Sequence, residues 1–237
     1  MLIFAHLESG TLMPILKQIL AGDGTRKTRL HDELGNFVPF DRLLLNGSRA
    51  FAGQLARHAI GFRPRKPWIS YDAARYLERH LTPQSRVLEY GSGMSTRWYA
   101  QRVLQVVSIE DYQPWFTQVS RELSAEAIQN VVYRFATDRG SYVTPTKIEA
   151  EGGFDLIMVD GKYRDACVNA SINLLRPGGI LYLDNSDRGT SDHSGDTQAA
   201  VGAIREFARE RGAELTLFTD FAPAQFVVQQ GLAMRLP

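Results

Sequence analysis

The sequence has little of what marks secreted, membrane-spanning or nucleic-acid-binding proteins. Its 237 residues include one cysteine, Cys167, which excludes an internal disulfide, fits a reducing cytoplasm and lies in an apolar helical pattern typical of a small core residue. No apolar run approaches the ~20 residues that span a bilayer, and the apolar start at 1–5 is too short for a signal peptide. The formal net charge of +1 lacks the excess of a dedicated nucleic-acid binder. We therefore expect a cytoplasmic protein with no membrane partner, and nucleic acid is disfavoured as a partner.

The first 66 residues show neither strand alternation nor an internal repeat. Apolar residues at helical spacing over 12–19, and a second helical stretch over 40–60, predict an N-terminal helical extension at 1–66 ahead of a domain at 67–237. Between residues 42 and 66 there are arginines and lysines but no carboxylate. Two interpretations stay open: the solvated face of a helical cap, or a surface for an anionic substrate or an RNA backbone. An apolar helical extension of this kind also suggests a homodimer.

From residue 70 onward, strand-like and helix-like patterns alternate. The pattern predicts an α/β fold: a doubly wound, Rossmann-like sheet of seven strands in which the short link through Pro223 makes the last two an antiparallel hairpin. Strands are expected at 86–90, 106–110, 131–136, 154–160, 180–184, 214–220 and 225–230. Helices are expected at 70–81, 95–102, from 114 onward, 165–175 and 197–211, with a stop at the Arg-Pro-Gly-Gly stretch 176–179.

A glycine turn joins the first predicted strand to its helix. The run from Arg86 to Thr96 reads as an apolar strand ending in an acid, a Gly-Ser-Gly turn and a helix start at Ser95 or Thr96, which is the geometry of a nucleotide-type site. A dinucleotide fingerprint wants a small residue where Thr96 stands, and Glu89, two residues before Gly91, would repel a pyrophosphate. The same carboxylate would attract an ammonium group. The turn therefore favours a cofactor that carries an amino acid.

Acids end four of the predicted strands, where the carboxyl ends of a parallel sheet border a crevice. Glu110 follows Glu89 by 21 residues, close to the ~20 expected of an acid that accepts hydrogen bonds from both ribose hydroxyls. Asp160 and Asp184 end the fourth and fifth strands. We expect these acids to face one ligand cleft; the alternative for Glu110 is a surface acid at a strand end.

Together these segments resemble the class I S-adenosylmethionine-dependent methyltransferases. The resemblance covers about residues 69–230 and rests, in family order, on the segments 86–96, 106–111, 154–161 and 174–180. It implies S-adenosylmethionine as cofactor, with the methionine moiety on Glu89, Gly91 and Gly93 and the ribose on Glu110. The other cofactor-binding residues that it implies are Ser92, Ser95, Thr96, Asp160 and, near the adenine, Asp138.

A second, narrower resemblance is to the catechol-type O-methyltransferases, which use a metal ion. Asp160, with Asp184 and Asn185 at the end of the fifth strand, looks like their metal-binding set, and such oxygen ligands suit Mg²⁺ or Ca²⁺. The metal would lower the pKa of a substrate hydroxyl and orient it. Those relatives place a lysine base three residues after the first aspartate. This chain has Tyr163 at that position and Lys162 one residue earlier, so the base stays open.

The catalytic candidates are the groups near the expected methyl-donor end of the cleft. They are Asp160, Lys162 and His193, a histidine in a polar loop whose titration range suits a general base. Tyr163 and Arg164 follow Lys162 directly and are the candidate substrate contacts, Arg164 for a carboxylate or phosphate. The alternative for Arg164 is a salt bridge with a nearby aspartate, and for His193 a solvated loop position.

The sequence thus predicts a methyltransferase that acts on a small-molecule acceptor, at oxygen. An NAD-dependent oxidoreductase is the first alternative; it leaves Thr96 and the terminal hairpin unexplained. A non-catalytic protein with the same fold is the second, although Glu89, Glu110 and Asp160 are all present. RNA methylation through residues 42–66 is a minority interpretation because the overall charge is balanced.

Overall fold

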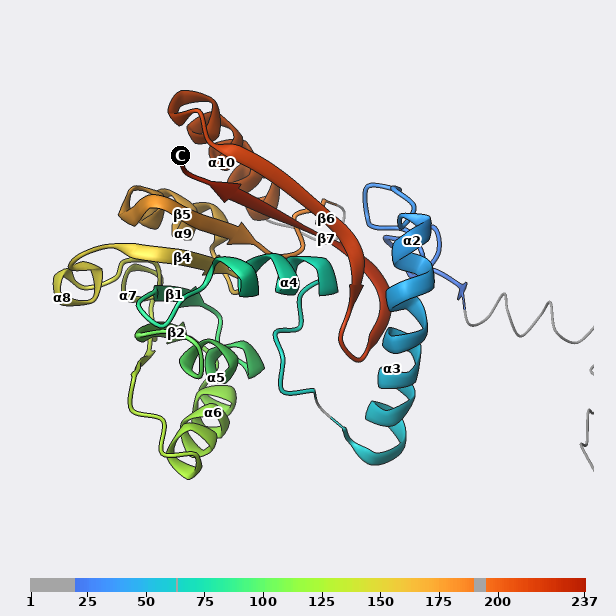
Figure 1. Ribbon diagram of the computed structural model, residues 1–237, viewed down its shortest axis with the longest axis horizontal. Helices are drawn as coiled ribbons and strands as arrows, with labels where there is room; N and C mark the ends of the chain where they lie inside the picture. Colours follow the sequence, from blue (N-terminus) through green and yellow to red (C-terminus); the bar gives the residue numbers. More distant parts are fainter. Residues whose placement is uncertain (1–19, 63, 190–194) are drawn as a thin grey trace, which may run out of the picture.

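The computed structural model describes residues 20–62, 64–189 and 195–237. Its centre is a seven-stranded sheet in the order β3-β2-β1-β4-β5-β7-β6 (Figure 1). The first five strands in the chain are parallel, and β7 runs antiparallel to both of its neighbours, β5 and β6. The predicted fold class is confirmed. The strands are β1 (Arg86–Tyr90), β2 (Gln105–Glu110), β3 (Val131–Phe135), β4 (Phe154–Val159), β5 (Leu175–Leu183), β6 (Glu214–Ala222) and β7 (Gln225–Arg235).

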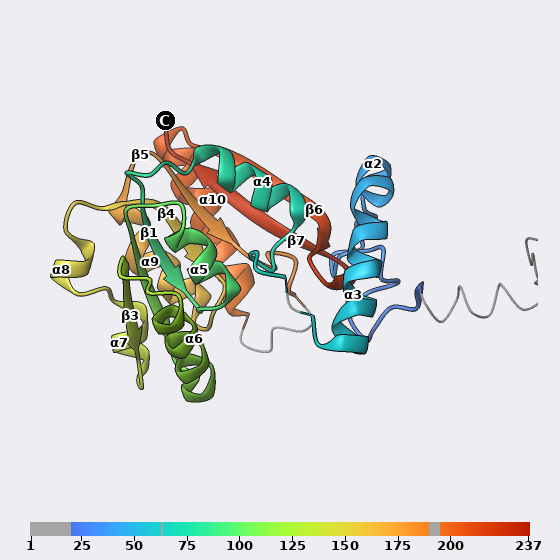
Figure 2. The ribbon, with the colours of Figure 1, turned by 60° about the horizontal axis from the view of Figure 1, so that its bottom comes forward.

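Helices cover both faces of the sheet (Figure 2). In the described chain they are α2 (Phe40–Arg42), a π-helix (Leu43–Gly47), α3 (Ser48–Ile60), α4 (Tyr71–His80), α5 (Met94–Ala100), α6 (Gln113–Ala125), α7 (Arg139–Val143), α8 (Lys147–Ala150), α9 (Arg164–Ser171), a 3₁₀ turn (Ile172–Leu174) and α10 (Asp196–Arg211). Ser70 caps α4 as predicted, since its hydroxyl accepts the Ala73 N–H at 3.1 Å.

Two apolar cores lie on opposite faces of the sheet because successive strand residues alternate between them. Leu88 of β1 packs in the core that α9 and α10 cover, whereas Val87 packs in the core under α4 and α5. Cys167 is fully buried in the first core, which confirms it as a core residue. Each buried leucine or valine contributes roughly 1.5–3 kcal/mol by leaving water.

Three local predictions were wrong. The fifth strand does not begin after the Pro-Gly-Gly stretch but at Leu175, with a shift in its register to β4 between Phe154 and Leu156. The last strand runs on to Arg235, because the residues after Gln230 continue to pair with both neighbours. Two short helices, α7 and α8, form between β3 and β4, where no helix was expected.

The N-terminal extension packs on the β6–β7 hairpin. A helix was expected over 40–60, and the structure has α2, the π-helix and α3 there; the helix expected over 12–19 lies outside the described residues. Gly53 allows α3 to approach Ala224 in the hairpin turn, since a Cβ at Gly53 would lie 3.2 Å from the Ala224 backbone. Gln54 accepts the Phe226 N–H at 2.7 Å. The division at residues 66 and 67 stays a prediction.

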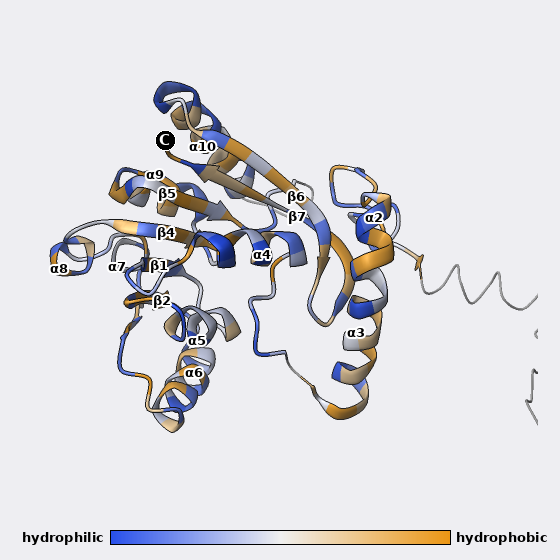
Figure 3. Cartoon of the chain, in the orientation of Figure 1, coloured by the Kyte–Doolittle hydropathy of each residue, from blue (hydrophilic) through white to orange (hydrophobic). Residues whose placement is uncertain are grey.

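The outer surface of this extension is partly apolar (Figure 3). Phe40, Leu44 and Ile60 are 71%, 65% and 79% exposed. The homodimer inferred from this surface stays a prediction. Among residues 20–62, 64–189 and 195–237, no helix combines the length and the apolar character that crossing a membrane requires.

Candidate functional site

The carboxyl end of β1 is built around the buried acid Glu89. Its carboxylate accepts hydrogen bonds from the hydroxyls of Ser95 at 2.5 Å, Thr96 at 2.6 Å and Ser108 at 2.7 Å, and the residue is fully buried. Burial raises the pKa of Glu89 to about 7, although the three hydroxyls act in the opposite direction. Thr96 also accepts the Gly93 N–H at 3.0 Å. Glu89 therefore holds the turn and the start of α5 together from beneath.

Gly93 lies at the top of this turn, buried beside the side chains of Trp115 and Ser95. Its φ of 173° is an extended conformation that any residue adopts. A Cβ at Gly93 would make only an ordinary contact, 3.7 Å from the Trp115 ring. The folded chain itself therefore does not require glycine here, and glycine is the residue that lets a ligand approach the backbone most closely.

Glu110 lies beside the turn, at the carboxyl end of β2. One of its oxygens accepts the N–H of Ser92 at 3.0 Å and the Ser92 hydroxyl at 2.8 Å; the other accepts the N–H groups of Asp111 at 3.0 Å and Tyr112 at 2.8 Å. The Ser92 hydroxyl lies 2.6 Å from the Tyr133 hydroxyl, so it has a second partner. A ligand hydroxyl can take its place on Glu110 while Ser92 turns to Tyr133. Tyr133 was not predicted to be near the site.

Asp138 follows β3 and caps α7. Its carboxylate accepts the Ser141 N–H at 2.9 Å and the Ser141 hydroxyl at 2.7 Å. These hydrogen bonds lower the pKa of Asp138. Because α7 was not predicted from the sequence, the role of Asp138 as its N-cap was not predicted either. The contact of Asp138 with an adenine ring stays a prediction.

The ends of β4 and β5 bring Asp160 and Asp184 together. The Tyr182 hydroxyl lies 3.3 Å from the Asp184 carboxylate, and a hydrogen bond joins the two aspartates. Burial, and then the neighbouring Asp160 charge, raises the pKa of Asp184 well above the usual range of a carboxyl. Asp184 is almost completely buried, whereas the Asp160 side chain is 40% exposed. Asp160 is thus the member of the pair that a ligand can reach.

Arg164 balances the negative charge of the acid pair, which is the role that the predicted metal would have. Its guanidinium lies 3.5 Å from the Asp160 carboxylate and donates to the backbone oxygens of Asp184 and Gly161. It already supplies the positive charge that faces the acid pair. In the described part of the chain, no group of three histidine, cysteine or acidic residues is arranged to hold a metal ion. Because Arg164 already faces the acid pair, the predicted site for Mg²⁺ or Ca²⁺ at Asp160, Asp184 and Asn185 receives no support.

Two of the substrate and catalytic candidates lie elsewhere than expected. Arg164 is only 3% exposed, so its charge is directed into the protein and not toward a substrate. Lys162 is exposed and its amine pairs with Asp111 at the end of β2; that hydrogen bond raises the pKa of Lys162, the opposite of what a base needs. His193 lies outside the described residues.

Backbone strain marks the same strand ends. Tyr163 after β4 has φ +52° and Asn185 after β5 has φ +46°. Asparagine adopts this left-handed region readily, whereas a bulky tyrosine rarely does. Such conformations cost about 1–3 kcal/mol and cluster at functional sites. Tyr163 remains 37% exposed, with its ring against Tyr142 and Arg139.

A polar cavity of about 730 Å³ opens beyond Asp160. Its walls come from the ends of β4, β5 and β7 and from an N-terminal segment, residues 23–33. The lining residues are Asp23, Gly24, Thr25, Arg26, Glu33, Trp68, Asp160, Asp184, Asn185, Arg188, Gln225, Val227 and Gln229. Of these, only Asp160, Asp184 and Asn185 are among the predicted site residues, as catalytic or metal-binding candidates; the N-terminal wall comes from far away in the sequence. The volume suits a small molecule.

Comparison with known proteins rests on structure, since neither a family model nor a curated protein sequence matches the chain. An O-methyltransferase from Bacillus cereus in complex with S-adenosylhomocysteine aligns over 83% of this chain and 94% of its own, with a TM-score of 0.54 and 20% identity. The O-methyltransferase TomG from Streptomyces achromogenes, in complex with S-adenosylmethionine, aligns over 95% and 96%, with a TM-score of 0.53 and 16% identity. An rRNA methylase from Streptococcus thermophilus aligns over 75% and 98%, with a TM-score of 0.50 and 17% identity.

The chain has the class I methyltransferase fold.

Within this methyltransferase fold the candidate site has two halves. The first is the crevice over β1 and β2, with the Glu89 turn, Gly93 and the Glu110 carboxylate. The second is the cavity over β4, β5 and β7. Asp160 stands at their junction, since β4 neighbours β1 and Asp160 lines the cavity.

Proposed function

We propose that this protein is an S-adenosylmethionine-dependent methyltransferase that acts on a small-molecule acceptor, at oxygen. The observation that carries the proposal is the crevice over β1 and β2 of a class I methyltransferase fold. There, Gly93, which the folded chain does not require to be glycine, lies beside the Glu110 carboxylate. The Ser92 hydroxyl that donates to Glu110 has the Tyr133 hydroxyl as a second partner, so a ligand hydroxyl can replace it. The donor's methionine end would lie over Gly93 and its ribose on Glu110. When bound, the sulfonium supplies an electrophilic methyl group.

The residues of the chain would then bind, orient and deprotonate the acceptor. Glu110 exchanges the Ser92 hydroxyl for a ribose hydroxyl and fixes the donor along the strand ends. Of the catalytic candidates, Asp160 is the one on the cavity wall, since Lys162 pairs with Asp111. Asp160 would accept the proton of the acceptor hydroxyl, while Arg164 holds the aspartate in place from behind.

The alternatives receive less support. The fold of an NAD-dependent oxidoreductase does not account for a strand β7 that runs antiparallel between β5 and β6. RNA binding through residues 42–66 is less favoured because three of the described cations there have partners: Arg49 stacks on Tyr71, Arg57 stacks on Trp68, and Arg42 pairs with Asp72.

Calorimetric titration with S-adenosylhomocysteine tests the proposal. We expect one site per chain, and an affinity at least about tenfold weaker in Glu110→Gln, which lacks the full carboxylate. The matched control is Glu78→Gln, an exposed acid of α4 paired with Arg102, which should bind as the wild type does. Circular dichroism checks that each variant is folded. A folded wild-type protein that binds NADH but not S-adenosylhomocysteine would contradict the proposal.

A further inference from the structure

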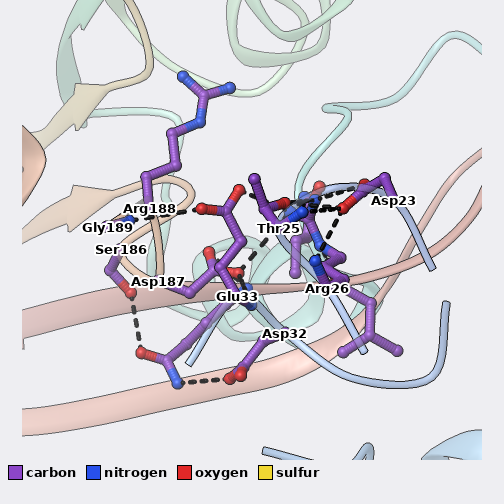
Figure 4. Close-up of polar contacts among 12 residues, drawn as sticks. Asp23, Thr25, Arg26, Asp32, Glu33, Ser186, Asp187, Arg188 and Gly189 are labelled. Carbon is purple, nitrogen blue, oxygen red and sulfur yellow. Dashed lines mark hydrogen bonds and ion pairs between the residues drawn. The ribbon is translucent and has the colours of Figure 1, made fainter. Parts of the chain in front are cut away.

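The loop that follows β5 is fixed by a buried acid, Asp187 (Figure 4). Asp187 is fully buried, and its carboxylate accepts the N–H of Glu33 at 3.0 Å and the N–H of Gln230 at 3.2 Å. The Arg26 guanidinium lies 3.8 Å away. One residue of the loop therefore joins the N-terminal segment, β7 and the end of β5, and the backbone on either side of it has little freedom.

The other charged groups on this side of the cavity form ion pairs, with more acids than cations. Arg26 pairs with Asp23 at 3.1 Å and with Glu33 at 3.2 Å, and donates to the Val228 backbone oxygen. Asp23 also accepts two backbone N–H groups and the Thr25 hydroxyl. At the far wall, Asp160 faces Arg164. Of the two cations among the described residues that line the cavity, Arg26 is therefore paired with acids, and the other is an exception.

The exception is Arg188, the residue directly after Asp187. Its backbone is fixed at both ends: the N–H donates to Asn185 at 3.0 Å, and the carbonyl accepts from the Gln198 amide at 2.8 Å. Its side chain lines the cavity, is exposed and, within the described chain, makes no hydrogen bond or ion pair. Figure 4 shows it extended away from the network around Arg26.

Arg188 lines the same cavity as Asp160, and the two form no ion pair. An unpaired guanidinium on a fixed backbone presents a planar fork of N–H donors that matches a carboxylate or phosphate. Because its backbone is already held, little further ordering is needed when an anion binds.

We propose that Arg188 binds an anionic group of the acceptor, so that the acceptor is a hydroxy acid or a hydroxyl-bearing phosphate whose hydroxyl lies at Asp160. The proposal rests on the proposed function and names its substrate class. The buried Asp187 network acts as the positioning device that aims Arg188 into the cavity.

The test uses full-length protein saturated with S-adenosylhomocysteine, whose binding is first measured by itself. A panel of aromatic and aliphatic hydroxy acids, the methyl ester of each acid, and hydroxyalkyl phosphates is then titrated by calorimetry. The same panel is assayed for methyl transfer from radiolabelled S-adenosylmethionine. We expect binding and turnover with the acids or the phosphates but not with the esters; which of the two anions is preferred identifies the source of the negative charge.

Variants decide whether Arg188 is responsible. In Arg188→Gln we expect the KM of the anionic acceptor to rise at least about tenfold with kcat changed much less, because a binding contact is lost. Arg188→Lys should recover part of the loss, and S-adenosylhomocysteine should bind all of these proteins equally. The matched control is Arg205→Gln, an exposed arginine of α10 away from the cavity.

Three results would overturn the proposal: esters that serve as well as acids, an unchanged KM in Arg188→Gln, or no acid or phosphate that binds the loaded protein. Each leaves the proposed function intact, as long as S-adenosylhomocysteine binds. If S-adenosylhomocysteine itself does not bind, it is the proposed function that fails.

Discussion

Gly91 and Gly161 lie back to back at the ends of β1 and β4: a Cβ on Gly91 would stand 2.9 Å from the Gly161 Cα. Gly91 also has φ +88°, a conformation that only glycine adopts without strain. Two residues later, Gly93 is extended and has room for a side chain. The two glycines of one turn therefore have different roles: Gly91 is required by the fold, whereas we assign Gly93 to the approach of a ligand to the backbone.

This difference predicts opposite phenotypes for two alanine variants. Gly91→Ala should lower the free energy of unfolding by about 1–3 kcal/mol through backbone strain and crowding, which lowers the thermal midpoint by about 2–4 °C per kcal/mol. Gly93→Ala should melt within about a degree of the wild type but bind S-adenosylhomocysteine at least about tenfold more weakly, because its Cβ fills the ligand's space. Calorimetry of both variants checks this. Wild-type affinity in Gly93→Ala would show that the ligand lies elsewhere.

The raised pKa of Glu89 predicts proton release on cofactor binding. Burial places it at about 7 in the folded chain, so Glu89 is protonated at about pH 6. The ammonium of S-adenosylhomocysteine favours the carboxylate and lowers this pKa, so binding at about pH 6 should release a proton and binding at about pH 8 should not. Calorimetry in buffers of different ionisation enthalpy measures the release. Glu89→Gln should abolish the proton release. If the heat of binding to the wild type at about pH 6 is the same in all buffers, the ammonium group does not lie near Glu89.

Asp220 predicts a pH-dependent contribution to stability. It is fully buried and accepts from the Asn46 amide at 2.7 Å and the Asp72 N–H at 3.3 Å; burial raises its pKa from 3.8 to about 6. Because the folded-state pKa lies above the unfolded value, the contribution of Asp220 to stability is full below about pH 4 and is lost as the pH rises through about 6.

Asp220→Asn cannot ionise and should therefore gain relative to the wild type over that interval. We expect the difference in thermal midpoint between Asp220→Asn and the wild type to shift in favour of the variant from about pH 4 to 6 and to stay constant above. The control Asp41→Asn removes an exposed acid and should show no such trend. A difference that does not vary with pH would mean that the pKa of Asp220 is the same in the folded and the unfolded protein.

Most of the fold could be predicted from the sequence because the local patterns and the overall topology agree. The strand segment 156–159 has both faces covered, and its uninterrupted apolar run is typical of a parallel sheet. The terminal hairpin followed from the short link through Pro223. The start of β5 did not, because Pro177 and Gly178 signal a break, whereas strand pairing across a shifted register accommodates them.

The site was predictable only where the ligand contacts lie close together in the sequence. The Glu89 turn and Glu110 end adjacent strands, so pattern and spacing were enough to bring them together. The prediction that Arg164 contacts the substrate was wrong because the sequence places it after β4 but does not show where its side chain points. The side chain turns inward, to the ends of β4 and β5. Arg188 was missed because its setting depends on Asp187 and on residues more than a hundred positions earlier in the chain.

The most direct test of the account is a crystal structure of the protein with S-adenosylhomocysteine. The account predicts the ligand across the ends of β1 and β2, its amino-acid end over Gly93 and a ribose hydroxyl on Glu110 in place of the Ser92 hydroxyl. A ligand bound elsewhere, with Ser92 still donating to Glu110, would contradict it.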